Sequence, residues 1–363
     1  MTPAPIAYFV SSHGFGHAAR SAAVMESIHD RSQETQLSIF TGVPRWFFED
    51  SMTAPFDYVK CHTDVGLVQA TPMDEDLPAT LGELSNFLPL REESVERAAK
   101  DVRSFGCRLV ASDISPLGIA VAAKLGLPCA LIENFTWDWI YRAYLEDEPR
   151  LAFFIDELHR LYSSVPLRIQ AQPYCEPVTG AAEVSPISRS VRQSAQEIRT
   201  KLQLPGDSSF VLMTMGGFQV SYRFLERLYR YPEVTFVIPG AADRIHRERN
   251  LIRLPHRTTF QHADLVAAAD MVVGKLGYST LAEVIQAETP YLFIQRPRFP
   301  ESPALASYAR RRLVCAEITE PELEAAEWPG LLPELKRNRR APTIEQQGSQ
   351  QAAGLLLDLI DSR

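Results

Sequence analysis

The stretch from Asp270 to Glu283, with the sequence DMVVGKLGYSTLAE, constrains the fold of this chain most strongly. Its apolar run, Met271–Val273, is typical of a buried parallel strand. Glycines follow at positions 274 and 277, and a helical pattern then begins. A strand, a glycine turn and a helix start leave several backbone N–H groups without partners inside the helix, at the positive end of its dipole. The stretch therefore predicts a site for a phosphate or diphosphate group.

The residues of this stretch leave a second interpretation open. Thr280 and Glu283 have the spacing of a capping box, in which the hydroxyl and the carboxylate satisfy backbone N–H groups of the first helical turn. In that case both side chains are structural and neither contacts a ligand.

Length and charge bound the class of protein. A chain of 363 residues suits two domains, and a net charge of −8 disfavours nucleic acid as a partner. The five cysteines are scattered without a C-x-x-C pair, which indicates a reducing compartment rather than a disulfide framework or a zinc site. No run has the length of a membrane span and no signal-peptide pattern occurs, so we expect a cytoplasmic protein and leave peripheral membrane contact open.

Strand-like and helical patterns alternate in both halves of the chain, which predicts an α/β fold of two Rossmann-like, doubly wound domains facing across a cleft. The expected strands are 6–10, 36–40, 109–111, 128–132, 168–171, 210–214, 235–238, 258–260, 271–273 and 290–294. Residues 64–89 are expected to form a loop. We place the first domain at 1–178, the second at 179–342, and a tail helix at 343–363 that packs back on the first domain.

The first strand leads into a glycine loop, HGFGH at 13–17. It differs from the dinucleotide-binding G-x-G-x-x-G because Ala19 occupies the third glycine position, which disfavours NAD. His13 and His17 are four residues apart, but glycines lie between them and no third ligand is near, so no metal is assigned. His17 at a helix start could, as a neutral imidazole, accept a proton from a hydroxyl. Alternatively, both histidines only cap the loop.

Other polar residues follow predicted strands. Asp113 should lie at the cleft edge, where it could orient His17 and stabilise an imidazolium, or else act as a helix N-cap. Gly216 and Gly217 could admit phosphate oxygens close to the backbone, or form a tight turn. The acidic run at 74–76 has the D-x-D form that some transferases use for a metal, but in a polar loop it is more typical of a solvated surface.

Three motifs carry a family resemblance: HGFGHA at 13–18, NFTWD at 134–138 and GKLGYST at 274–280. The first is similar to the acceptor-side loop of MurG-like and UDP-glycosyltransferase proteins, which have the two-domain GT-B architecture. All three in this order resemble more closely the N-terminal, glycosyltransferase-like half of plant arabinokinase and its bacterial relatives.

The resemblance implies a role for each candidate residue. His13, Gly14 and Gly16 belong to the acceptor-side loop, and His17 and Asp113 form the catalytic pair. The donor-binding residues would be Gly216, Gly217, Lys275, Gly277, Tyr278, Ser279, Thr280, Glu283 and Glu301. Among these, Glu283 would bind the ribose hydroxyls, 277–280 the diphosphate, and Glu301 the donor sugar.

We therefore expect a glycosyltransferase that moves a sugar from a nucleotide-diphosphate sugar, a UDP-sugar by this resemblance, to an acceptor hydroxyl with inversion. His17 would be the general base, and neither a metal nor a cofactor beyond the donor would be needed. A nucleotide-sugar 2-epimerase or hydrolase, and a non-catalytic nucleotide-sugar-binding protein, remain alternatives. Trp137, Trp139 and Tyr141 are either an acceptor platform or core residues.

Overall fold

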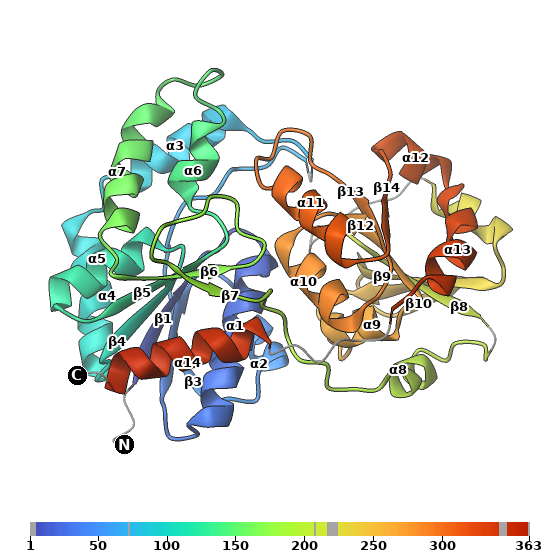
Figure 1. The fold of residues 1–363 in the computed structure, drawn as a ribbon, viewed down its shortest axis with the longest axis horizontal. Helices are drawn as coiled ribbons and strands as arrows, with labels where there is room; N and C mark the ends of the chain where they lie inside the picture. Colours follow the sequence, from blue (N-terminus) through green and yellow to red (C-terminus); the bar gives the residue numbers. More distant parts are fainter. Residues whose placement is uncertain (1–4, 72, 207, 216–223, 341–346, 362–363) are drawn as a thin grey trace. The chain divides into compact units, whose positions relative to one another are not determined.

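The computed structural model describes residues 5–71, 73–206, 208–215, 224–340 and 347–361, which form two compact units (Figure 1). The first unit contains the residues up to Ile187, the short segment Phe299–Glu301 and the tail helix. The second contains Ser188–Arg298 and the described residues from Ser302 onward. Each unit has a sheet covered by helices, which confirms the predicted α/β class.

The first sheet has the strand order β3-β2-β1-β4-β5-β6-β7, and all its described pairings are parallel. Its strands are β1 Ile6–Val10, β2 Leu37–Thr41, β3 Phe56–Lys60, β4 Leu109–Asp113, β5 Cys129–Glu133, β6 Leu167–Ala171 and β7 Ala182–Val184. The central strands are buried along their whole length because helices cover both faces, which explains their continuous apolar runs. The chain leaves β1 toward β2 and returns on the other side at β4, so the strand order reverses between β1 and β4.

The second sheet repeats this plan with the order β10-β11-β9-β8-β12-β13-β14. Its strands are β8 Ser209–Thr214, β9 Val234–Ala242, β10 His246–Glu248, β11 Leu251–Pro255, β12 Met271–Lys275, β13 Tyr291–Ile294 and β14 Cys315–Glu317. Only the β10–β11 pairing is antiparallel among the described strands. Here the strand order reverses between β8 and β12. Ligands of open α/β sheets bind at such reversal points, beyond the carboxyl ends of the strands.

The helices of the first unit are α1 Phe15–Arg31, α2 Arg45–Ser51, α3 Leu77–Phe87, α4 Glu92–Ser104, α5 Pro116–Leu125, α6 Trp137–Arg142, α7 Leu151–Ser163 and α14 Gly348–Asp361. Those of the second are α8 Ala195–Lys201, α9 His262–Ala268, α10 Tyr278–Ala287, α11 Ser302–Arg312, α12 Glu320–Ala325 and α13 Leu332–Arg337, with 3₁₀ turns η1 Leu225–Arg230 and η2 Trp328–Leu331. None of the helices in the described ranges is long and apolar enough to cross a membrane.

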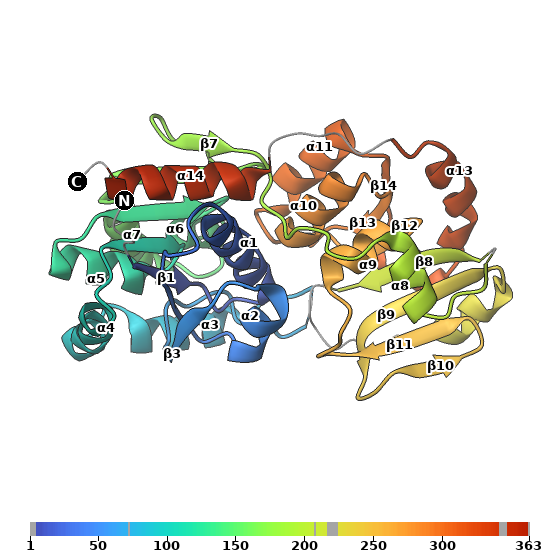
Figure 2. The ribbon, with the colours of Figure 1, turned by 90° about the horizontal axis from the view of Figure 1, so that it is seen from below.

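The tail helix α14 lies along α1 in the first unit (Figures 1 and 2). Ala352, Ala353 and Leu356 are fully buried. The side chain of Gln351 accepts a hydrogen bond from the backbone N–H of Ser185, at 2.7 Å. The tail therefore adds both apolar packing and a polar contact to the first unit.

The structure differs from the sequence analysis at three places. The first unit extends beyond residue 178, because Ala182–Val184 pairs in parallel with β6. Residues 64–89 are not only a loop, because α3 occupies Leu77–Phe87; its proline lies in the first turn, where the missing N–H costs nothing. Residues 258–260 are not a strand, and the strand beside β9 is Leu251–Pro255.

Candidate functional site

The glycine loop of the first unit lies where the strand order reverses. β1 and β4 are parallel neighbours, and their register pairs Val10 with Asp113. The backbone N–H of Ser11 donates to the carbonyl of Asp113, at 3.2 Å. Gly14, with φ of 71°, forms the N-cap of α1, a conformation that glycine adopts without strain. The loop thus delivers the first turn of α1 to the end of β4.

His17 and Asp113 meet at this edge, as the sequence analysis expected of their positions. Nδ1 of His17 lies 2.8 Å from Oδ1 of Asp113, and both side chains are buried. Because the carboxylate accepts, the proton of a neutral imidazole lies on Nδ1, and Nε2 carries the lone pair. Within the described part of the chain, no hydrogen-bond partner is seen for Nε2. The pair can therefore take a proton from a hydroxyl placed at Nε2.

Arg20 is a third member of this group that the sequence analysis missed. Its Nε donates to Oδ2 of Asp113 at 2.8 Å and its Nη2 to Oδ1 at 2.6 Å. Ser21 Oγ donates to the same carboxylate at 3.1 Å. An arginine and a serine three and four residues after His17 share its helix face, which was the available signal.

The ionisation state of Asp113 follows from these neighbours. Burial opposes the charged carboxylate, but the charge of Arg20 and the hydrogen bonds from Arg20 and His17 outweigh burial. Together they lower the pKa of Asp113 to about 2. Asp113 is therefore a carboxylate at neutral pH, and its charge is balanced by a guanidinium that is itself only 1% exposed.

Asn134, the first residue after β5, continues the polar network to Glu301. Its Oδ1 accepts from Nη1 of Arg20 at 2.6 Å, and its Nδ2 donates to Oε1 of Glu301 at 2.6 Å. Glu301 belongs to the short segment 299–301 that is part of the first unit, where Phe299 packs edge-on against Phe135. The family resemblance implies that Glu301 binds the donor sugar; in the structure its carboxylate accepts from Asn134.

Asp64 links the glycine loop to α6 by hydrogen bonds. Its carboxylate accepts from Nε1 of Trp137 at 2.7 Å and from the backbone N–H of Ser12 at 3.2 Å. Trp137 and Tyr141 are fully buried, so these two residues are core and do not form an exposed acceptor platform. His13 packs edge-on against Trp137, and its ring fills the space beside a glycine at position 66.

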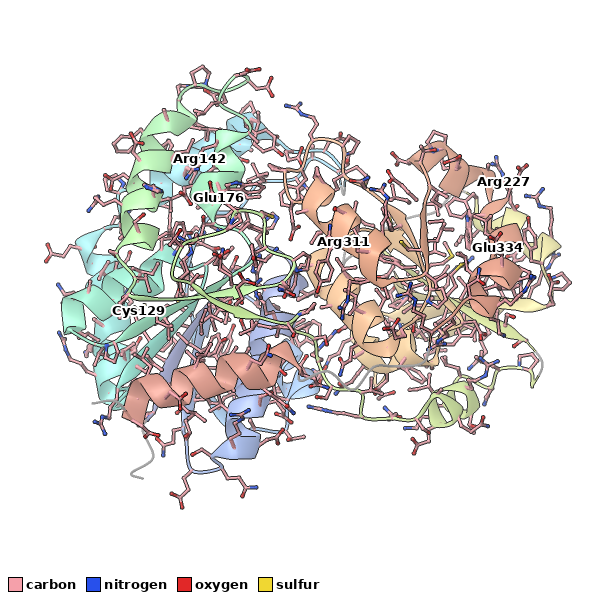
Figure 3. All side chains as sticks on the ribbon, viewed as in Figure 1. Cys129, Arg142, Glu176, Arg227, Arg311 and Glu334 are labelled. Carbon is pink, nitrogen blue, oxygen red and sulfur yellow. The ribbon has the colours of Figure 1, made fainter. Side chains whose placement is uncertain are left out.

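An ion-pair cluster anchors α6 to the segment after β6. Arg142 pairs with Asp138 at 2.8 Å and with Glu176 at 3.5 Å; Figure 3 labels Arg142 and Glu176. One residue earlier, the N–H of Cys175 donates to the carbonyl of Asn134 at 2.7 Å. The segment after β6 therefore stabilises the backbone at Asn134.

The second unit carries its candidate site at the reversal between β8 and β12. The register pairs Gly274 with Thr214, and a Cβ on Gly274 would lie 1.7 Å from the carbonyl oxygen of Thr214, so only glycine fits. α10 begins at Tyr278, and Gly277 is its N-cap. The strand, turn and helix start predicted from the sequence are thus present.

The predicted diphosphate residues surround this helix start. Gly277 and Ser279 are partly exposed, whereas Tyr278 and Thr280 are buried. Lys275 ends β12, and its carbonyl accepts from the hydroxyl of Tyr291 at 2.7 Å. A Cβ built on Gly277 would meet no atom of the described residues within 4 Å. Gly216 and Gly217 lie outside the residues that the structure describes.

Glu283 does not form a capping box with Thr280, because no side chain caps α10. Its Oε1 accepts from Nε and Nη2 of Arg189, at 3.0 and 2.8 Å, and its Oε2 lies 2.5 Å from Nδ1 of His262. The other ring nitrogen of His262 lies 3.3 Å from the hydroxyl of Thr214. If Glu283 has a structural role rather than a ligand-binding one, that role is therefore in an ion-pair network at the strand ends. It does not cap the helix.

The same network sets the charge of Glu283. Burial opposes ionisation, but the charges of Arg189 and His262 and their hydrogen bonds outweigh it and lower its pKa to about 2. A buried carboxylate at the ends of β8 and β12 can accept hydrogen bonds from hydroxyl groups. Arg189 and His262 were not singled out from the sequence, since their pairing with Glu283 spans 94 and 21 positions.

The acidic run at 74–76 has local structural partners. Asp76 is the N-cap of α3 and accepts from the N–H of Ala79 at 2.9 Å. Asp74 accepts from the hydroxyl of Thr71 at 2.8 Å. In the described ranges, no group of three or more histidine, cysteine or acidic side chains is arranged to hold a metal ion.

Comparisons with known proteins agree with this architecture. No protein-family model matches the chain. It is 26% identical over 327 residues to L-arabinokinase of Arabidopsis thaliana, an alignment that covers 89% of this chain and 31% of that protein. The chain thus spans about a third of this relative's length. It is also 24% identical over 251 residues to an uncharacterized glycosyltransferase of Methanopyrus kandleri, covering 65% of this chain and 71% of the relative.

Solved structures show the same fold over the full chain. The glycosyltransferase SnogD from Streptomyces nogalater superposes with a TM-score of 0.59 at 16% identity, covering 99% of this chain and all of that one. A UDP-glucosyltransferase from Polygonum tinctorium gives a TM-score of 0.61 at 13% identity, with 99% of each chain covered. The chain therefore has the two-domain GT-B fold of glycosyltransferases, as the three sequence motifs predicted.

Proposed function

We propose that this protein is a glycosyltransferase that moves a sugar from a nucleotide-diphosphate sugar to an acceptor hydroxyl. The observation that carries the proposal is the contact of His17 with Asp113, 2.8 Å, at the reversal point of a GT-B sheet. A histidine with its Nδ1 proton held by a carboxylate presents Nε2 as a base. The relatives named as glycosyltransferases and the GT-B fold support sugar transfer as the reaction.

His17 would deprotonate the acceptor hydroxyl as it attacks the anomeric carbon of the donor sugar. The C–O bond to the nucleotide diphosphate breaks as the new glycosidic bond forms, so the sugar configuration inverts in a single displacement. The proton moves from the acceptor oxygen to Nε2 of His17, and Asp113 stabilises the imidazolium. Asp113 stays ionised throughout, since its pKa of about 2 is far below neutral pH.

The second unit would bind the donor. The N-terminal turn of α10 supplies N–H groups and a positive dipole end for the diphosphate, and Lys275 supplies a cation at the end of β12. Glu283 would accept hydrogen bonds from the ribose hydroxyls. We propose a UDP-sugar as the donor, since a UDP-glucosyltransferase is among the similar structures. In this scheme the reaction needs neither a metal ion nor a separate cofactor.

The first test is thermal unfolding of the whole chain with UDP, GDP, dTDP and their common sugars. A ligand at about a hundred times its Kd stabilises the folded state by roughly 2.7 kcal/mol, which is a readily measured shift. We expect UDP and a UDP-sugar to stabilise the protein and the other bases to do so less. An absence of any shift at millimolar ligand would contradict a nucleotide site at Gly277–Thr280.

Product analysis separates transfer from the alternatives. The protein is incubated with the stabilising nucleotide sugar, with and without a panel of hydroxyl acceptors. Nucleotide release that depends on an acceptor supports transfer. Free sugar or an epimer formed without an acceptor would instead indicate a hydrolase or 2-epimerase, and binding without turnover a nucleotide-sugar-binding protein.

A further inference from the structure

A buried chain of polar side chains joins the two ends of the first-unit site. It runs from His17 to Asp113, from Asp113 to Arg20, from Arg20 to Asn134 and from Asn134 to Glu301. Every link is 2.8 Å or shorter, and the five residues are each at most 8% exposed. A continuous network therefore connects the proposed base to the carboxylate of Glu301.

Arg20 is the branching point of this network. Nε and Nη2 bind the two oxygens of Asp113, while Nη1 binds Asn134. Nη2 also lies 3.1 Å from Nδ1 of His17. Because the guanidinium is always charged, it balances the Asp113 carboxylate and leaves the pair without net charge.

This balance bears directly on the protonation of His17. A lone carboxylate at 2.8 Å would favour the imidazolium, which cannot accept a proton, whereas a cation at 3.1 Å opposes it. The other ionisable groups around Arg20 and Asp113 are Tyr8 on β1 and Glu133 at the end of β5, together with Glu301 beyond Asn134. Arg168 pairs with Glu133, whereas Arg20 is the cation that lies against Nδ1 of His17.

Asn134 transmits the orientation of Arg20 to Glu301. Its oxygen faces a cationic donor, so its amide nitrogen must point the other way, toward the Glu301 carboxylate. Neither a carboxylate nor an apolar side chain at position 134 could make both contacts. A primary amide is thus the group that fits between a guanidinium and a carboxylate.

We propose that Arg20 is a positioning residue of the transfer reaction: it keeps His17 uncharged beside Asp113 and, through Asn134, orients the Glu301 carboxylate. The inference rests on the proposed function, because it assigns His17 the role of base. Arg20 does not touch the substrate in this scheme. It acts on the protonation of His17, which does touch the substrate.

The test follows the ring of His17 by NMR in protein labelled at histidine, with the signal assigned by its loss in His17→Gln. In Arg20→Gln, removal of the cation favours the imidazolium, so the titration midpoint moves to higher pH than in the wild type. Asn134→Leu changes no charge and leaves the midpoint unchanged.

Arg168→Gln is the matched control. Arg168 pairs with the buried carboxylate of Glu133 at 2.8 Å in the same sheet, and this pair does not include Asp113. Its loss should leave the His17 midpoint in place. If Arg20→Gln does not fold, Arg20→Lys carries the test, since it keeps a cation beside Asp113 but lacks the guanidinium N–H that binds Asn134. The His17 midpoint should then stay in place while KM for the nucleotide sugar rises. A midpoint unchanged in Arg20→Gln, or a KM unchanged in Arg20→Lys, would overturn the proposal.

The second arm concerns Glu301. Asn134→Leu should raise KM for the nucleotide sugar by about tenfold through the lost orientation of Glu301, while the affinity for the nucleotide alone is unchanged. An unchanged KM would remove the link between Asn134 and the donor sugar. Midpoints that move as expected in a protein without transfer activity would support Arg20 as the group that sets the His17 charge and would contradict the proposed function.

Discussion

Nδ1 of His17 lies 2.8 Å from Oδ1 of Asp113, although 96 positions separate the two residues in the sequence. The contact exists because β1 and β4 are parallel neighbours whose carboxyl ends meet at one edge of the sheet. The glycine loop after β1 is short, so α1 starts close to the end of β4. Because the carboxylate accepts at Nδ1, the contact determines which nitrogen of a neutral His17 ring carries the proton.

We predict that His17→Ala lowers kcat by about 10²–10⁴-fold, which is the usual contribution of a general base. The second-unit residues are untouched, so nucleotide affinity in a calorimetric titration should equal that of the wild type. His29→Ala is the matched control, since it removes an imidazole from the same helix. Transfer that persists undiminished in His17→Ala would show that another group takes the proton.

Asp113→Asn should affect stability as well as catalysis. The variant leaves the buried Arg20 without its counter-charge, which costs about 3–5 kcal/mol of unfolding free energy. It also changes the pH dependence. The folded-state pKa of about 2 is below the ordinary value of 3.8, so ionised Asp113 stabilises the fold above that value and loses this effect as pH falls toward 2.

Urea unfolding at a series of pH values checks this prediction. Wild-type stability should fall between about pH 5 and pH 2, and Asp113→Asn should show a smaller fall over the same window. Some slope remains in both proteins because the pKa of Glu283 is also lowered to about 2. Equal slopes in the two proteins would contradict the low pKa of Asp113.

The sequence was sufficient to predict the parts of the site that follow from short, local sequence patterns. A strand followed by glycines and a helix start is a local pattern, and it located β12 and α10. The rule that parallel strands end at one edge was enough to bring Asp113 toward His17. These predictions needed no knowledge of which side chains meet.

The missed features depend on tertiary pairing. Arg20 and Asn134 lie 114 positions apart, and no local pattern marks an arginine that will be buried against an asparagine. β11 was missed because Arg253 and Pro255 interrupt its apolar pattern, and it becomes a strand by pairing with β9. Trp137 is a core residue because its fully buried ring donates from Nε1 to Asp64, a contact that spans 73 positions and that no local pattern marks.

Glu283→Gln tests the proposed hydrogen bonds from the ribose hydroxyls to Glu283. The amide is a weaker acceptor than the carboxylate, so we predict a loss of about tenfold in UDP affinity, while inorganic pyrophosphate, which has no ribose, binds as before. Glu334→Gln changes a solvent-exposed glutamate of the second unit and serves as the control. An equal loss of UDP and pyrophosphate affinity would indicate that Glu283 only supports the fold through Arg189 and His262.

Two glycines of the predicted diphosphate turn should respond in opposite ways to alanine. At Gly274 a Cβ would lie 1.7 Å from the carbonyl of Thr214, so Gly274→Ala forces β8 and β12 apart and destabilises the second unit by about 3 kcal/mol or more. Gly277 has an extended backbone, with φ of −146°, and no described residue has an atom within 4 Å of its Cβ position. Gly277→Ala should therefore fold normally.

In the proposed donor site, the methyl group of Gly277→Ala would obstruct the approach of the diphosphate to the first turn of α10. We predict wild-type thermal stability for this variant without ligand, and a reduced shift with UDP. Gly330→Ala is the control, because its Cβ likewise meets no atom within 4 Å in the part of the chain that the structure describes, and it lies in the 3₁₀ turn η2. A full UDP shift in Gly277→Ala would move the diphosphate away from the start of α10, and with it the interpretation of GKLGYST as the donor-binding turn.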